Sequence, residues 1–261
     1  MLNHFTQRIL LLLLCAFIQS GDLSAQKVKK PFEAKQGYLI SVNYGFYVPG
    51  ADMADRFGWN SGIGVDCKFK FEKGWMIGGS YSWGFGRNIQ PAAQDIFDSL
   101  TGPSGEIIDQ DGLYSVIRLN ERVHCMAIEG GRLFPVSKLN KNSGILIQVG
   151  VGAMYHRIDV YASTAKVPQV TGDYEKGYDR LSGGLMFNQF IGYQHLDPKK
   201  QINFNIGFMA QQAFTSSLRT TQFDIREHDN TERTDLLNGL RVGITLPIYT
   251  KRPEEEQYFT D

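Results

Sequence analysis

A strict alternation of apolar residues with small or charged residues runs from 61 to 71 (SGIGVDCKFKF). The apolar set is Ile63, Val65, Cys67, Phe69 and Phe71, and between them lie Gly62, Gly64, Asp66, Lys68 and Lys70. Successive side chains of a β-strand point to opposite faces, so this segment has one apolar face and one face of glycine and charge. Lipid accepts the first face and a barrel interior accepts the second, so the pattern predicts a strand of a transmembrane β-barrel.

Related patterns recur and predict strands at 37–48, 59–71, 75–85, within 113–134, and at 145–156, 181–193, 202–211 and 236–249. The expected fold class is all-β, an eight-stranded antiparallel transmembrane β-barrel over residues 37–249. Within 113–134 we favour Met126, Ile128 and Phe134 outward, because this choice keeps the charge of Glu129 out of lipid. Segment 181–193 leaves Gln189 on the outward face, and a bulge near Asn188 would correct this. The facing of these two segments stays open.

The N-terminus has the features of a secretory signal peptide. Arg8 precedes the apolar run 9–18, and a small-residue site, Leu23-Ser24-Ala25, follows. We therefore expect residues 1–25 to be removed by cleavage before Gln26, with 26–36 as a short periplasmic segment. The expected location is the outer membrane of a Gram-negative cell.

Charge and hydropathy exclude other classes. The chain has 27 basic and 27 acidic residues, and loss of Arg8 and Asp22 with the signal peptide leaves it neutral. Without a basic patch, a nucleic-acid partner is not expected. Beyond residue 25 there is no run of about 18 apolar residues, so no membrane helix is expected. Cys67 and Cys125 lie inside strand patterns, which favours two isolated thiols over a disulfide.

The lengths of the connections indicate an orientation. Short connections are expected at 72–74, 135–143 and 197–200, and long ones at 87–112, 157–180 and 215–234. Bacterial barrels have short periplasmic turns and long outer loops. Because an even number of strands returns the chain to the side where it started, both termini are expected in the periplasm. Residues 95–100, in a long loop, are expected to form one helical turn.

The strand series and the last strand, Arg241-Val-Gly243-Ile-Thr-Leu246-Pro-Ile248, resemble the small outer-membrane barrels of the OmpA and OmpX type. The last strand departs from the assembly signal of that family in having aliphatic hydrophobic residues and a tail after it. The site before Gln26 and the segment Tyr178-Asp179-Arg180-Leu181 also look like uncharacterised barrels of Bacteroidota. That second resemblance implies a role in protein secretion of type IX or in gliding, with outer-membrane lipid as the surroundings.

Four inward residues, Asp66, Lys68, Glu129 and Arg241, are the candidate polar cluster of the lumen. The first interpretation is an ion-paired filling, because eight strands enclose a space that side chains occupy. The alternative is a gated or proton-linked path. The two interpretations differ in whether a continuous channel passes these residues.

Catalytic, cofactor and metal sites are not predicted. No histidine has serine two positions later, and none has an i,i+4 histidine or a Cys-x-x-Cys partner. The Gly-x-Gly pairs at 62–64, 84–86 and 150–152 lack the rest of a nucleotide loop, and crowding in the lumen explains them.

The tail, residues 250–261, is acidic and then aromatic. It is interpreted either as a solvated end or as a docking peptide in which Tyr258 and Phe259 are the partner contact and Glu254–Glu256 steer toward a basic surface. The expected function is a non-enzymatic structural or assembly component that contacts envelope proteins through its outer loops or its tail. The alternatives are a hydrolase of outer-membrane lipid and a narrow small-solute channel.

Overall fold

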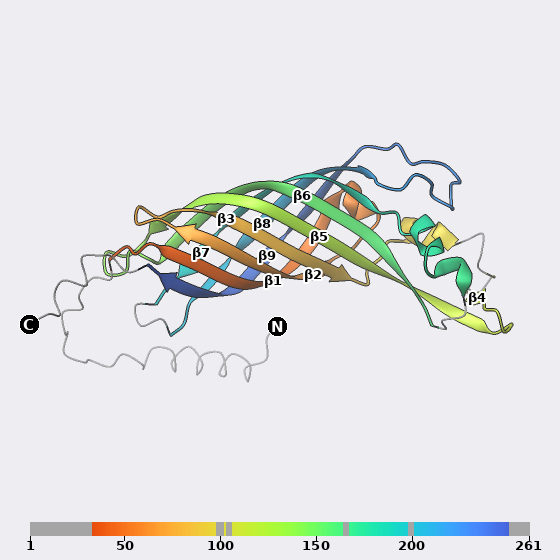
Figure 1. Ribbon diagram of the computed structural model, residues 1–261, viewed down its shortest axis with the longest axis horizontal. Helices are drawn as coiled ribbons and strands as arrows, with labels where there is room; N and C mark the ends of the chain where they lie inside the picture. The colour runs from red at the N-terminus through yellow and green to blue at the C-terminus, as the bar shows by residue number, and fades with distance from the viewer. Residues whose placement is uncertain (1–32, 98–101, 103–105, 164–166, 198–200, 251–261) are drawn as a thin grey trace, which may run out of the picture. The chain divides into compact units, whose positions relative to one another are not determined.

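The computed structural model describes residues 33–97, 102, 106–163, 167–197 and 201–250 (Figure 1). Its strands are β1 (Gly37–Ala51), β2 (Asn60–Lys70), β3 (Trp75–Gly86), β4 (Glu106–Ile108), β5 (Tyr114–Pro135), β6 (Gly144–Ala162), β7 (Ser182–His195), β8 (Phe204–Ser217) and β9 (Arg233–Tyr249). Short helical turns are η1 (Asp52–Asp55), α2 (Pro91–Gln94), η2 (Asp95–Phe97), η3 (Pro168–Val170) and η4 (Tyr174–Gly177). Among the described residues, no helix is long and apolar enough to cross a membrane.

Eight of the strands close into a ring. Their order is β3-β2-β1-β9-β8-β7-β6-β5, and β3 also pairs antiparallel with β5. The row of paired residues that leaves β1 at Ile40 passes once around the ring and returns to β1 at Gly50, a shift of ten residues (50 minus 40). A stagger of this kind requires strands tilted by about 35–45° to the barrel axis. The predicted fold class is confirmed.

The ring presents apolar side chains outward and mainly polar side chains inward. On β5, Met126 and Ile128 are exposed, Ile128 to 68%, whereas Glu129, the residue after Ile128, is 3% exposed. Phe134 is exposed on the same outer face. The favoured facing of this segment is therefore confirmed. Arg132 lies over the rings of Trp75 and Phe134, at 5.2 Å from each ring centroid.

The predicted bulge near Asn188 is wrong. β7 pairs residue for residue with both neighbours, through Gly150↔Asn188 and Val149↔Gln189 on one side and Asn188↔Gln211 on the other. Leu185, Phe187 and Ile191 face outward as expected, and Gln189 faces outward with them. Regular pairing of all the flanking residues outweighs the preference of a single amide for the interior.

Long connections lie at one end of the ring, the long-loop end, and short ones at the other, the short-turn end. At the long-loop end β5 and β6 continue past Glu121, the last residue of β5 that pairs with β3, as far as Ile117↔Ala162. β4 then pairs with the start of β5. The fifth predicted strand, 145–156, corresponds to β6 but ends six residues too early, and β4 was not predicted, because apolar alternation is informative only where the outer face meets lipid.

A loop cap packs at the long-loop end, where Figure 1 shows β4 and the short helices gathered. Its rings come from three loops: Phe97 lies 4.9 Å from Tyr178, and Tyr178 lies 5.4 Å from Phe223, measured between centroids. Met53 and Ile96 are among its fully buried residues. The predicted helical turn at 95–100 is realised as α2 and η2 over 91–97, and residues 98–100 lie outside the described residues.

Asp179 is the polar centre of this loop cap. Its carboxylate accepts hydrogen bonds from Arg219 Nε at 2.9 Å and Arg219 Nη2 at 2.5 Å, and from the backbone N–H of Leu181 at 3.1 Å. Arg180 follows with φ of 45° and pairs with Asp224. The segment Tyr178-Asp179-Arg180-Leu181, singled out by resemblance, thus joins two loops of the cap.

The short-turn end is crossed by residues 33–36. Lys70, 1% exposed, donates from Nζ to the Lys35 carbonyl oxygen at 2.7 Å and to Asn142 Oδ1 at 2.9 Å. Asn142 Nδ2 donates to the Glu33 carbonyl oxygen at 2.6 Å. This segment is therefore fastened both to the end of β2 and to the β5–β6 connection.

Candidate functional site in the barrel lumen

The four residues of the candidate polar cluster come together inside the barrel. Asp66 and Lys68 project from β2, Glu129 from β5 and Arg241 from β9, and each is at most 5% exposed. Because side chains alternate along a strand, residues two apart, such as Asp66 and Lys68, share the inner face. Two acids and two bases balance in charge, as a buried cluster requires.

Lys68 is the centre of the cluster. Its Nζ lies 2.7 Å from Glu129 Oε2 and 3.0 Å from Asp66 Oδ2, and it donates to Gln148 Oε1 at 3.2 Å. An ammonium has three protons to donate, so these three acceptors use its full capacity. Lys68 therefore joins β2 to β5 and β6 across the lumen.

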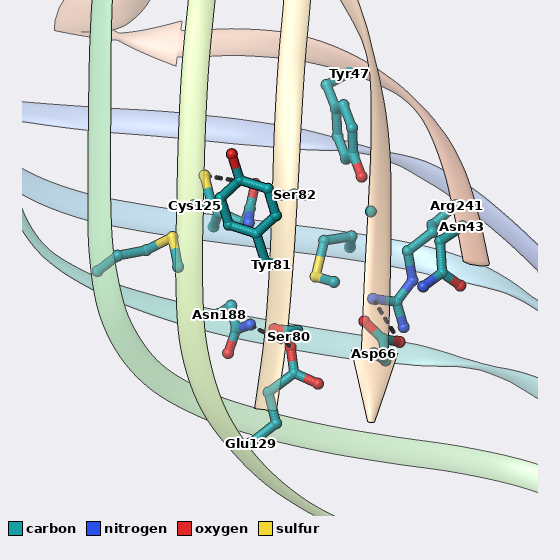
Figure 2. A pocket seen from close by; sticks show the side chains of 14 residues that line it. Asn43, Tyr47, Asp66, Ser80, Tyr81, Ser82, Cys125, Glu129, Asn188 and Arg241 are labelled. Atoms are coloured by element: carbon teal, nitrogen blue, oxygen red, sulfur yellow. Dashed lines mark hydrogen bonds and ion pairs between the residues drawn. The ribbon is translucent and has the colours of Figure 1, made fainter. Parts of the chain in front are cut away.

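Glu129 and Arg241 extend the cluster to other strands. Glu129 Oε1 accepts from Ser80 Oγ at 2.6 Å and from Asn188 Nδ2 at 2.7 Å. Arg241 Nη1 lies 3.6 Å from Asp66 Oδ2, and its guanidinium lies 4.2 Å from the centroid of the Phe190 ring. Figure 2 shows Glu129 with Ser80 and Asn188 on one side and Arg241 with Asp66 on the other.

Little free volume remains beside the cluster. The cavity in Figure 2 measures about 20 Å³ and is lined by Asn43, Tyr47, Cys125 and Gln211 among others. A volume of this size holds about one water molecule. Inward glycines add to the crowding: a Cβ on Gly152 would lie 1.8 Å from the Met126 carbonyl oxygen. The lumen at this level is packed with protein atoms.

A second buried cluster lies nearer the long-loop end and was not predicted. His156 Nε2 lies 2.8 Å from Asp235 Oδ2, which also accepts from Thr215 Oγ1 at 2.5 Å. Both His156 and Asp235 are at most 1% exposed. The inward parity of His156 was visible in the sequence, but the last strand was expected to begin at 236, which left Asp235 in a loop.

This second cluster does not assemble a serine hydrolase site. Ser182 is opposite His156 in the β6–β7 pairing, but its Oγ donates to the Arg180 carbonyl oxygen at 3.2 Å and accepts from Arg56 Nη1 at 3.2 Å. His156 Nδ1, the nitrogen not bonded to Asp235, has no hydrogen-bond partner among the described residues. A nucleophile must be within hydrogen-bond reach of its base, and here it is not.

A wider cavity of about 480 Å³ lies at the long-loop end. Arg56, Arg180 and Arg233 line it together with Asp52, Asp55, Asp229 and Glu232, so both signs of charge face the space. Arg180 forms an ion pair with Asp224, and Arg233 forms one with Asp229. Among the described residues, no group of three or more histidine, cysteine or acidic side chains could hold a metal ion.

The remaining predictions concern other places. Cys67, exposed on β2, and Cys125, buried on β5, are both free thiols. Two predictions lie outside the described residues: the partner contact of the tail, Tyr258 and Phe259, and the signal peptide, residues 1–25.

Comparison with known proteins identifies no family. No protein-family model matches the chain, and no curated protein matches it. Among solved structures, Neisserial surface protein A superposes with a TM-score of 0.45 at 10% identity, covering 83% of this chain and 100% of that chain. Ail, the attachment invasion locus protein of Yersinia pestis, has a TM-score of 0.40 at 9% identity, covering 81% and 99%.

The class of protein follows from the ring itself. Eight antiparallel strands close without a free edge, the outer face is apolar, and the inner face is polar and packed. Only such closure satisfies the backbone groups of strands in lipid. The chain is a transmembrane β-barrel whose lumen is packed at the level of Lys68.

Proposed function

We propose that this protein is a non-conducting, non-enzymatic barrel of the outer membrane that serves as a structural or assembly component of an envelope complex. The observation that carries the proposal is the charge-balanced cluster around Lys68, which fills the lumen and joins β2 to β5 and β6. A channel would need a continuous path past these side chains. A barrel without a path serves through its surfaces, and the loop cap is an ordered surface at the long-loop end of the ring.

The finer assignment rests on the sequence. The signal-peptide pattern supports secretion to the envelope, and the even number of strands with short turns at one end supports periplasmic termini. Resemblance to barrels of Bacteroidota supports a role in type IX secretion or gliding as the particular complex. Lipid hydrolysis is the weaker alternative, because no serine of the described residues hydrogen-bonds to the buried His156–Asp235 pair.

Conductance measurement tests the closed lumen. Purified protein inserted into planar lipid bilayers should show no steady open pore over a range of voltages. The control is a barrel of known conductance in the same bilayer. Reproducible single-channel currents that Arg241→Ala abolishes would contradict the proposal and favour transport.

Affinity capture tests the assembly role. Tagged protein purified from its native membrane in mild detergent should retain envelope proteins that mass spectrometry identifies. Asp179→Ala, which removes the acceptor of Arg219 in the loop cap, should reduce this retention. Asp173→Ala is the matched control, because the Asp173 side chain is 92% exposed and pairs with Lys176, three residues away in the same loop. Equal retention by both variants would exclude the loop cap as the binding surface.

A further inference from the structure

An unpartnered amide lies near mid-height on the outer surface. Gln189 is exposed on β7, six residues from the strand end at His195 and seven from the other end at Ser182. Its outward neighbours on the strand are Phe187 and Ile191, which are 40% and 55% exposed. Among the described residues, no hydrogen bond to the Gln189 side chain is present. This level of the barrel faces hydrocarbon.

Hydrocarbon cannot satisfy this group. A primary amide has two donor protons and an acceptor oxygen, and lipid tails offer no hydrogen-bond partner. A mid-strand position is also too deep for a side chain of this length to reach water at either interface. Polar side chains in such positions form contacts across packed membrane segments.

The surroundings of Gln189 allow a protein surface to approach. Ala210 lies directly opposite on β8, and Gln212 lies two residues further along that strand on the same outer face. A small residue beside a polar one permits close backbone approach, as in other membrane contacts. The two amides therefore lie diagonally across β7 and β8 on one patch, here called the amide patch (Gln189, Ala210 and Gln212).

We propose that the amide patch is a contact between two copies of this chain within the membrane. Both copies insert in the same direction, so a two-fold axis that relates them must run along the membrane normal. Such an axis keeps each residue at its own depth, which brings Gln189 of one copy to Gln189 of the other. Two amides at equal depth satisfy each other by reciprocal N–H to carbonyl hydrogen bonds. This inference does not depend on the proposed function.

Disulfide trapping in native membranes tests the contact directly. Ala210→Cys, which leaves the opposite residue Gln189 in place, is made in a Cys67→Ala background, because Cys67 is itself exposed on β2. Mild oxidation should give a dimer of this chain at least ten times more abundant than with Val65→Cys, an outward position on β2, in the same background. Equal yields at the two positions, or trapping only of a different protein, would overturn the proposal.

Substitution provides the second measurement. Gln189→Leu should convert the dimer to monomer in lipid nanodiscs, measured by mass photometry, and should leave the heat-dependent gel mobility of a folded barrel unchanged. Asn120→Leu is the matched control, an amide-to-leucine change on β5, which does not adjoin the amide patch, and should leave the dimer intact. A wild-type protein that is monomeric at every protein-to-lipid ratio, or a Gln189→Leu protein that remains dimeric, would also overturn the proposal.

Discussion

At the residue scale, the interior of this barrel is decided by charge balance. Asp66, Lys68, Glu129 and Arg241 are each almost fully buried, and a buried charge is tolerated only when it is paired and hydrogen-bonded. Lys68 meets this condition with two carboxylates and one amide oxygen. Such clusters are weak evidence for extra stability, but breaking one partner is costly.

Removal of Lys68 should therefore destabilise the barrel. We expect Lys68→Met to lower the free energy of unfolding by about 3–5 kcal/mol, because Glu129 and Asp66 lose their shared cation. The double variant Lys68→Met/Glu129→Gln restores the charge balance with Asp66 and Arg241 and should recover about 1–3 kcal/mol. Urea titration in detergent micelles, followed by tryptophan fluorescence, measures both.

An exposed ion pair provides the control for the Lys68 variants. Lys141 pairs with Glu33 at 2.8 Å, with the two side chains 46% and 66% exposed. Lys141→Met should change stability by about 0–1 kcal/mol, since exposed ion pairs contribute little. A Lys68→Met protein as stable as this control would show that the lumen cluster has no energetic role.

At the element scale, the loops of the long-loop end are ordered by packing and ion pairs of their own. The connection from β8 to β9 contains Asp229, whose carboxylate accepts from the Thr231 N–H at 3.0 Å and pairs with Arg233. Burial alone would raise the pKa of Asp229, but the hydrogen bonds from Thr231 and the Arg233 guanidinium outweigh it and lower the pKa to about 2. This connection is therefore ordered in part by a single ionised carboxylate.

Acid should loosen this connection before it affects the strands. The pKa of Asp229 in the folded protein is below its ordinary value of about 4. The stabilisation that ionised Asp229 provides is therefore complete above pH 4 and is lost as the pH falls through 2. Hydrogen exchange of residues 229–233, corrected for the intrinsic rate, should show less protection at pH 2 than at pH 5. Asp229→Asn should show the lower protection at both values, and a pH-independent wild type would contradict the assignment.

At the scale of the whole molecule, the chain enters and leaves the barrel at the same end. The backbone N–H of Thr250 donates to the carbonyl oxygen of Gln36 at 3.1 Å, so the chain enters and leaves the ring side by side at the short-turn end. The tail that follows is proposed to be periplasmic, with Tyr258 and Phe259 as its partner contact.

Deletion of residues 254–261 should leave the barrel folded and reduce the capture of periplasmic partners. The ring ends at Tyr249, so no strand pairing is removed. Heat-dependent gel mobility checks folding, and affinity capture with mass spectrometry checks partners. Labelling of a tag after Asp261 on intact cells would contradict the periplasmic placement, and full retention of partners by the truncated protein would leave the tail as a solvated end.

The sequence by itself determined the closed eight-stranded barrel and the inward facing of Asp66, Lys68 and Arg241, and it favoured the inward facing of Glu129. It could do so because lipid outside and a narrow lumen inside impose a two-residue period on every strand. Contacts between distant strands and loops were decided only by the tertiary structure: the Lys68 partners, the buried His156–Asp235 pair and the loop cap around Asp179. Strand register and loop packing bring together residues that are far apart in the chain. Outside the lipid layer the loops have no two-residue period, so the sequence pattern does not predict these contacts. The position of Gln189 needed both the sequence and the structure. Its outward parity was visible in the sequence, but only the unbroken pairing on both sides of β7 showed that no bulge removes it from the lipid face.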